Sequence, residues 1–277
     1  MRSIAVINQK GGVGKTTSSV NLAAALADAG RRVCLIDLDP QAHASLHVGI
    51  TAVDNEITTY ELLCTDATVS QAKKQITENL FVLPANLDLA AAELELAGEV
   101  GREMILRDKL TEHDEEFDYL ILDCPPSLGV LTVNALVAVT EVFLPLQPHF
   151  LALHGLSKLL RTIEIVSRRM NNQLRLSGVM LCMYDSNTRL AAEVSTDIDD
   201  FFKASTTSGG RDFYANAKFF DTRIRRNIRL AEAPSFGQSI FQYAPGSNGA
   251  NDYRALAEEV IAQEEAMAQP SRERAAA

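Results

Sequence analysis

The residues with the clearest chemical potential form an eight-residue stretch of glycines, lysines and threonines near the start of the chain. The stretch reads Lys10, Gly11, Gly12, Val13, Gly14, Lys15, Thr16 and Thr17, between an apolar run and a helical pattern. Glycines let backbone N–H groups approach phosphate oxygens, and a helix N-terminus adds donors and the positive end of its dipole. We expect Lys15 to supply a positive charge to the outer phosphates and Thr16 to supply a hydroxyl ligand for Mg²⁺. Residues 10–17 are therefore expected to bind a nucleotide.

Two carboxylates follow the next apolar run, in which Asp37 and Asp39 precede Pro40 and Gln41. Acids at the C-terminal end of a parallel strand face the crevice where ligands bind. Being two residues apart, Asp37 and Asp39 would point the same way from an extended segment. We expect one to act on Mg²⁺ through water and the other on an attacking water. A polar turn capped by Asp would give the same pattern.

A third carboxylate, Asp123, ends the apolar run of residues 119–122 and precedes Cys124, Pro125 and Pro126. An acid in this position holds the water shell of magnesium in nucleotide hydrolases. A turn stiffened by two prolines is compatible with the same role. The expected metal-site residues are thus Thr16, Asp37 and Asp123.

The phosphate loop departs from the pattern G-x-x-x-x-G-K-[ST], because Gln9 replaces the first glycine and an additional lysine, Lys10, follows it. In this form it resembles the deviant Walker A motif of the ParA/MinD family of ATPases, and residues 18–27 resemble its ParA/Soj branch. The resemblance implies that Lys10 reaches across a dimer interface to the partner's ATP, which links nucleotide state to dimerisation. It also implies a slow, partner-stimulated ATP hydrolase whose catalytic residues are Lys10, Lys15 and Asp39, with Asp39 positioning the water.

Residues 227–237 resemble the family segment N-x-R-L-x-E-A-P-S-x-G, which lies over the adenine in relatives. The resemblance implies that Pro234 contacts the base. Met183 is a candidate for the other face of the ring, although it equally suits core filling at a strand end. Just before this segment, Arg225 stands where the family commonly has the proline of Ile-Pro-Arg-Asn. The implied cofactors are ATP and Mg²⁺.

Residues 218–229 form a basic cluster in a chain whose net charge is −10, because they include five basic residues and one acid. Such clusters are usually solvated faces. The ParA resemblance, however, places DNA-binding arginines in this region and near residue 189. We expect the ATP-bound dimer to bind double-stranded DNA without sequence preference and with strong salt dependence. The expected DNA contacts are Arg189, Lys218, Arg223, Arg225, Arg226 and Arg229.

Four histidines mark departures from the family pattern. His43 and His47 lie where many partition ATPases have Gly-Asn-Ala, and His149 and His154 lie where acidic residues are usual. His43 and His47 are four apart and could share a helix face, but a zinc site of the HExxH type would need a glutamate where the chain has Ala44. We interpret His43 and His47 as loop or surface histidines. Because the four histidines depart from the family pattern, the surface that contacts a partner stays unassigned.

Alternating apolar strands and helical patterns must position these residues. Strands are expected at residues 3–7, 32–37, 80–84, 119–123, 141–146 and 174–183, and helices at residues 16–29, 87–97, 130–139, 153–169, 189–202 and 252–267. This alternation predicts an α/β fold, a doubly wound and mostly parallel sheet with helices on both faces. The resemblance specifies a P-loop NTPase of the deviant Walker A class. No linker divides the chain, so we expect one ATPase domain at residues 1–268 and a disordered tail at 269–277.

Length and composition exclude several classes. The 277 residues are 47% hydrophobic and 22% charged, which excludes a disordered or fibrous chain. No apolar run reaches the length of a membrane span, and the first apolar run is too short for a secretory signal. Four widely spaced cysteines suggest no disulfide framework and favour a reducing compartment. The expected location is the cytoplasm, in association with the nucleoid.

The favoured interpretation is a partition ATPase that dimerises with ATP, coats DNA and is released when a ParB-like partner stimulates hydrolysis. A MinD-like membrane-cycling ATPase would need a basic and apolar C-terminal helix, whereas residues 257–267 are acidic, so no membrane partner is expected. An ATPase that positions a protein assembly along DNA would use the same residues, so chromosome, plasmid and protein cargo are not distinguished. A nitrogenase iron protein would need a partner cysteine for Cys124, and a bacterial tyrosine kinase would need a tyrosine-rich tail.

Overall fold

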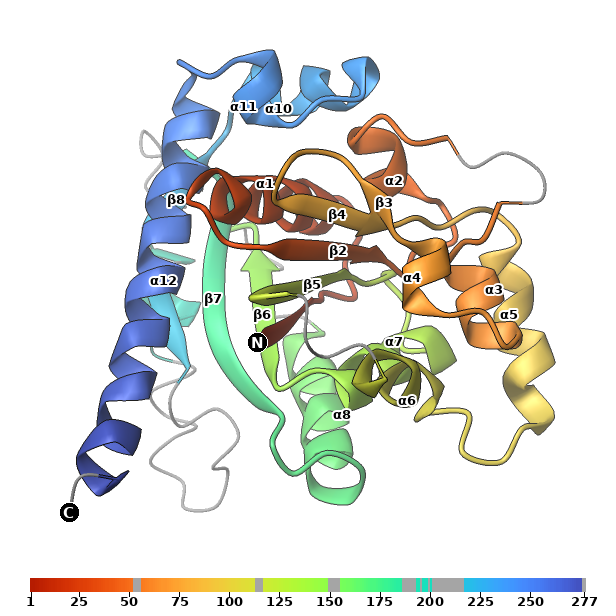
Figure 1. The fold of residues 1–277 in the computed structure, drawn as a ribbon. Coiled ribbons are helices and arrows are strands. Elements are labelled where there is room, and N and C mark those ends of the chain that lie inside the picture. The colour runs from red at the N-terminus through yellow and green to blue at the C-terminus, as the bar shows by residue number, and fades with distance from the viewer. Residues whose placement is uncertain are drawn as a thin grey trace.

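One mostly parallel sheet runs through the computed structural model, with helices on both of its faces (Figure 1). The structure describes residues 1–51, 56–112, 117–148, 155–185 and 217–275, with residues 193–194, 196–198 and 200 between them, and side chains up to residue 265. In spatial order, the eight strands of this part are β3 (Lys74–Gln75), β4 (Leu80–Leu83), β2 (Val33–Asp37), β5 (Tyr119–Asp123), β1 (Arg2–Val6), β6 (Glu141–Leu146), β7 (Arg175–Tyr184) and β8 (Lys218–Arg225). Only β3 is antiparallel to its neighbour among these strands.

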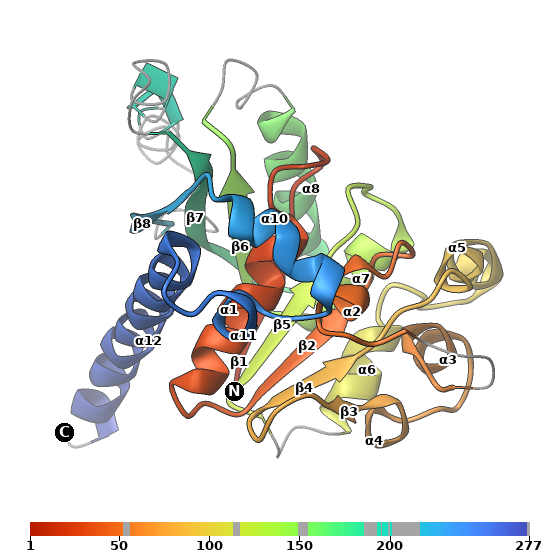
Figure 2. The same ribbon diagram turned by 90° about the horizontal axis from the view of Figure 1, so that it is seen from above.

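The helices form a layer on each face of the sheet. The first layer holds α1 (Lys15–Asp28), α2 (His43–His47), α10 (Ile228–Glu232), α11 (Ile240–Tyr243) and α12 (Asn248–Ala275) (Figures 1 and 2). The second holds α3 (Thr59–Cys64), α5 (Leu89–Glu95), α6 (Ile105–Thr111), α7 (Val130–Ala138) and α8 (Leu156–Arg169), with the short α4 (Val69–Ala72) beside them. Single turns of 3₁₀ helix occur at η1 (Leu96–Gly98) and η3 (Ala233–Phe236).

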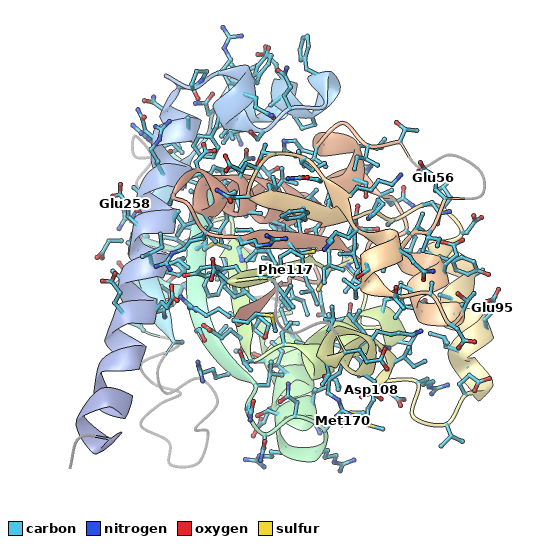
Figure 3. The ribbon with its side chains drawn as sticks, in the orientation of Figure 1. Glu56, Glu95, Asp108, Phe117, Met170 and Glu258 are labelled. Atoms are coloured by element: carbon cyan, nitrogen blue, oxygen red, sulfur yellow. The ribbon has the colours of Figure 1, made fainter. Side chains whose placement is uncertain are left out.

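Burial of both sheet faces explains the near-continuous apolar strands. One buried cluster packs α1 and α12 on the sheet, and the other packs α3 and α5 to α8 on the opposite face. Phe117 lies in the interior and meets Phe81 edge to face at 5.6 Å, whereas Glu95 and Glu258 project from the outer surfaces of their helices (Figure 3). The alanine-rich α1 has a nearly fully buried central turn, because small side chains let it lie close to the strands.

The strand order creates a crevice at the C-terminal end of β1. From β1 the chain runs to β2 on one side, and from β6 it continues through β7 and β8 on the other. Ligands bind at such reversal points in open α/β sheets. The loop after β1 is the predicted phosphate loop, so the fold places it at this crevice.

The predicted strands are confirmed to within one residue, but the two-residue strand β3 and the strand β8 were not expected. The sequence of β8 mixes charged and apolar residues, because it is an edge strand with one covered face, and such a strand lacks the continuous apolar run of its neighbours. Several helices of four to seven residues were also missed, since they are too short to show a helical period.

Predicted helices are confirmed at α1, α5, α7, α8 and α12, although α8 begins later than expected and α12 is longer at both ends. The expected helix at residues 189–202 falls largely outside the described residues. Because α12 extends to Ala275, no helix boundary lies at residue 268, and the division into one domain and a tail stays a prediction. No helix in the described part of the chain is both long and apolar enough to cross a membrane.

Candidate functional site

The phosphate loop ends at the N-terminus of α1, where Gly14 is the capping residue. Gly12 and Gly14 have φ of 71° and 91°, the left-handed region that glycine adopts without strain. The N–H groups of the first turn point toward the loop, as in any α-helix, and no side chain of Gly14 caps them. Such a turn is a binding site for phosphate groups.

The two lysines of the loop are linked through the backbone. The Lys15 Nζ donates to the Lys10 carbonyl at 3.1 Å, and the Lys10 N–H donates to the Asn8 Oδ1 at 2.9 Å. Asn8 in turn donates to the Pro145 carbonyl at 2.8 Å, which ties the loop to β6. Burial lowers the pKa of Lys15, and the carboxylates of Asp123 and Asp39 oppose this effect. The hydrogen bonds at the N–H and at the carbonyl of Lys10 therefore fix its backbone.

Asp37 and Asp123 are neighbours, because they are paired in the register of β2 and β5. Both are fully buried. Asp123 accepts hydrogen bonds from the Thr16 and Ser19 hydroxyls, each at 2.8 Å. Burial and the nearby Asp37 raise the pKa of Asp123 to about 7. α1 and β5 thus bring Thr16 and Asp123 into contact, while their role at a metal stays a prediction.

Asp37 holds the start of α2. It accepts from the Ser45 N–H at 2.8 Å, from the Ser45 hydroxyl at 2.7 Å and from the Asp39 N–H at 3.1 Å. Burial raises the pKa of Asp37 to about 6, against the effect of these hydrogen bonds. Its carboxylate therefore links the end of β2 to the segment that carries Asp39 and to the start of α2.

Asp39 lies beyond the end of β2, in the turn before α2. It is 8% exposed and accepts the Gln41 N–H at 3.0 Å. Ala42 then adopts a left-handed φ of 53°, which reverses the chain into α2. Asp37 and Asp39 are thus both in the crevice region, with Asp37 inside the sheet layer and Asp39 at its rim.

A cavity of about 490 Å³ opens beside the phosphate loop. Its lining includes Gly14 and Thr17 from the loop and Met183, which has a left-handed φ of 50°. Met183 therefore lies beside the loop, and its role as a base contact stays a prediction. The other lining residues are Cys182, Ile224, Arg225, Arg226, Asn227, Ile228, Leu230, Ala231 and Tyr253.

Pro234 does not line this cavity in the described structure. It lies in η3, which packs on the end of α2, where Gly237 and Gly49 approach each other through their backbones. The role of Pro234 as the base contact stays a prediction. The cavity residues of β8 and α12 were missed, because only the pairing of β8 with β7 brings them beside the loop.

The predicted DNA-binding residues of the described chain share β8 and the start of α10, and most of them have partners. Lys218 pairs with Glu259 at 3.4 Å, Arg225 with Asp252 at 2.5 Å, and Arg229 with Glu232 at 2.9 Å. Arg223 lies over the Tyr184 ring and donates to its hydroxyl at 2.5 Å. Arg226 is exposed. Arg189, and with it His149 and His154, lies outside the described residues.

The two histidines of α2 have different surroundings. His43 is exposed, whereas His47 is 1% exposed and its Nε2 lacks a hydrogen-bond partner in the described structure. Our interpretation of both as loop or surface residues is therefore wrong for His47, which packs inside. No group of three His, Cys, Asp or Glu side chains in the described residues is arranged to hold a metal on its own.

The buried His47 is expected to make the protein sensitive to acid. Burial lowers the pKa of His47 to about 4 from 6.5. Between these values the unfolded chain binds a proton that the folded chain does not, so stability falls as the pH falls. The expected loss from pH 8 to pH 5 is about 2 kcal/mol in the free energy of unfolding.

Urea unfolding of the wild type and of His47→Leu at both pH values measures this loss, with the exposed His43→Leu as the control. The wild type and His43→Leu should lose about 2 kcal/mol more than His47→Leu. Equal losses in all three proteins would contradict a neutral buried His47.

Comparison with known proteins shows relatives along nearly the whole chain. A family model described as an AAA domain matches residues 1–176. The sporulation initiation inhibitor protein Soj of Bacillus subtilis is 46% identical over 94% of this chain and 98% of its own length. The chromosome-partitioning ATPase Soj of Thermus thermophilus is 45% identical over 95% and 96% of the two chains, and the chromosome partitioning protein ParA of Caulobacter vibrioides is 42% identical over 95% of each.

Solved structures agree with this fold. A cobyrinic acid a,c-diamide synthase from Mycobacterium smegmatis with bound ATP analogue and magnesium superposes with a TM-score of 0.80 at 36% identity, covering 96% of each chain. The cell division ATPase MinD of Pyrococcus furiosus superposes with a TM-score of 0.74 at 26% identity, over 95% of this chain and 99% of its own.

Proposed function

Since the chain belongs to the Soj/ParA family of chromosome-partitioning ATPases, we propose that it is an ATP-driven DNA-partition switch. It binds ATP with Mg²⁺, forms a dimer around two nucleotides, binds DNA without sequence preference and hydrolyses ATP to ADP and phosphate. The observation that carries this proposal is the convergence of Lys15, Thr16 and Asp123 at one strand end. ATP hydrolysis, measured with and without DNA, tests the chemistry directly.

The side chains present fit a magnesium ion. Thr16 and Asp123 offer oxygen ligands already 2.8 Å apart, and Asp37 adds a second buried carboxylate. Two adjacent buried carboxylates are costly without a cation, and their raised pKa values express this cost. When bound, Mg²⁺ would neutralise charge on the terminal phosphates.

Different residues of the chain would then bind the phosphates, position the attacking water and join the two subunits. Lys15 and the N–H groups at the start of α1 hold the phosphates. Asp39, at the rim, accepts a hydrogen bond from the attacking water and orients it toward the terminal phosphate. Lys10 extends from a fixed backbone toward the ATP of the second subunit, and its charge favours the dimer only when nucleotide is present.

Lys218, Arg223, Arg226 and Arg229, which lie along β8, after it and in α10, would provide the surface for DNA. Most are already tied to acids or to Tyr184, so each alone binds phosphate weakly. Two copies in a dimer double the number of phosphate contacts, so ATP controls DNA retention through assembly. A ParB-like protein would complete the cycle by stimulating hydrolysis, and the cycle would run in the cytoplasm on the nucleoid.

Arg226 gives the simplest test of the DNA surface, because this residue is exposed and directly follows β8. Arg226→Ala is expected to lower the slope of log K against log salt by about 2 for a dimer, one for each lost phosphate contact. The measurement is DNA retention at several salt concentrations with saturating ATP. The exposed Arg107→Ala on α6, on the other face of the sheet, is the control and should keep the wild-type slope. An unchanged slope in Arg226→Ala would remove this residue from the DNA surface.

A further inference from the structure

Arg225 is clamped by a single carboxylate on α12. Its backbone N–H donates to the Asp252 Oδ2 at 2.9 Å, its Nε donates to Oδ1 at 3.0 Å and its Nη2 donates to Oδ1 at 2.5 Å. Asp252 is 6% exposed, so the carboxylate is itself held in place. One edge of the guanidinium is therefore consumed, and the plane of the group has a fixed orientation.

The clamped arginine lines the cavity that begins at the phosphate loop. Gly14 and Thr17 form the loop end of this cavity, and Arg225 lines it from β8. The next residue of α12, Tyr253, also lines it and shares a hydrogen bond of 3.0 Å with the Ser18 hydroxyl of α1. Two consecutive residues of α12 thus hold β8 and α1 around the same space, because α12 packs against both of these elements. Figure 2 shows α12 alongside α1.

A guanidinium whose edge is occupied still offers its flat faces. These faces stack on aromatic rings, most strongly on large ones. The same occupied edge makes Arg225 a poor phosphate ligand, although the sequence predicts it as a DNA contact.

Resting on the proposed function, we propose that Arg225 stacks on the nucleobase and favours purine over pyrimidine triphosphates, with Asp252 as the positioning residue that sets its plane. Arg225 then belongs to the nucleotide pocket and not to the DNA surface. This assignment explains why a half-exposed arginine at the end of an edge strand has both its backbone and its side chain fixed by one acid.

Competition binding with Mg²⁺ and three probes tests this assignment: ATP, CTP and base-free tripolyphosphate. Arg225→Ala should weaken ATP binding roughly tenfold, CTP binding less, and tripolyphosphate binding not at all. Asp252→Asn should shift the three in the same order by smaller factors, because the side chain still holds part of the clamp. The matched control is Arg168→Ala on α8, an exposed arginine that also pairs with a carboxylate, that of Glu164 at 2.9 Å, and it should bind all three probes like the wild type.

Several results would overturn the assignment. Equal weakening of all three probes in Arg225→Ala would indicate a general loss of the pocket, and unchanged ATP binding would remove Arg225 from it. Unchanged ATP binding together with lost DNA retention at saturating ATP would return Arg225 to the DNA surface. Failure of the wild type to bind ATP would instead refute the proposed function, and the assignment with it.

Discussion

Asp39→Ala is expected to bind ATP like the wild type and to lose nearly all ATP hydrolysis, with a rate about 10²–10⁴ times lower. The reason is that Asp39 lies at the rim of the site, where a carboxylate can orient water, while the proposed phosphate contacts come from the loop and α1. Single-turnover hydrolysis and equilibrium ATP binding should be measured together. Because binding is preserved, the variant should also stay on DNA.

Two variants sharpen this prediction. Asp39→Asn keeps the shape and the acceptor for the Gln41 N–H, so its failure to hydrolyse ATP would assign the effect to the charge. Asp66→Ala, at an exposed aspartate between α3 and α4, is the control and should turn over normally. A normal rate in Asp39→Ala would mean that another group positions the water.

Lys10→Ala is expected to bind ATP but to remain a monomer. Its charge is proposed to meet the phosphates of the other subunit, and losing one partner of a buried interfacial charge pair costs about 2–5 kcal/mol at each of the two sites. The dimer dissociation constant should therefore rise by at least about a thousandfold. Lys15→Ala distinguishes the role of Lys15 from that of Lys10, because this variant should fail to bind ATP.

Mixing variants tests whether Lys10 acts in the other subunit. A pair of Lys10→Ala and Asp39→Ala subunits contains one complete site, in which Asp39 comes from one chain and Lys10 from the other. At protein concentrations high enough to enforce pairing, the mixture should restore up to about a quarter of the wild-type rate, although each variant alone is inactive. A mixture as inactive as its parts would place Lys10 in its own subunit's site.

The sequence predicted which residues lie at the crevice better than it predicted which residues form its walls. The phosphate loop and the ends of β2 and β5 are local patterns, in which a glycine-rich turn or an acid after an apolar run indicates its own position. The contact between Thr16 and Asp123 follows once β1 and β5 are neighbours, and parallel strands make this arrangement natural. Such local signals survive without knowledge of the rest of the fold.

The cavity beside the phosphate loop could not be predicted in this way, because its walls depend on a strand whose pattern is that of a half-exposed edge. Arg225 stands in a run of basic residues, and only its contact with Asp252, far along the chain, distinguishes it from a surface charge. His47 was misplaced for a related reason. A five-residue helix has too short a pattern to show which side faces the interior, so burial was decided by packing of α2 on α1.

The mass of Asp39→Ala with saturating ATP and Mg²⁺ tests the central claim most directly. Sedimentation or scattering should give twice the 30.2 kDa of one chain with ATP, and one chain with ADP or without nucleotide. Lys10→Ala should stay at 30.2 kDa under every condition. A hydrolysis-deficient protein that has bound ATP and still sediments as a single chain would contradict a switch built on two subunits joined by nucleotide.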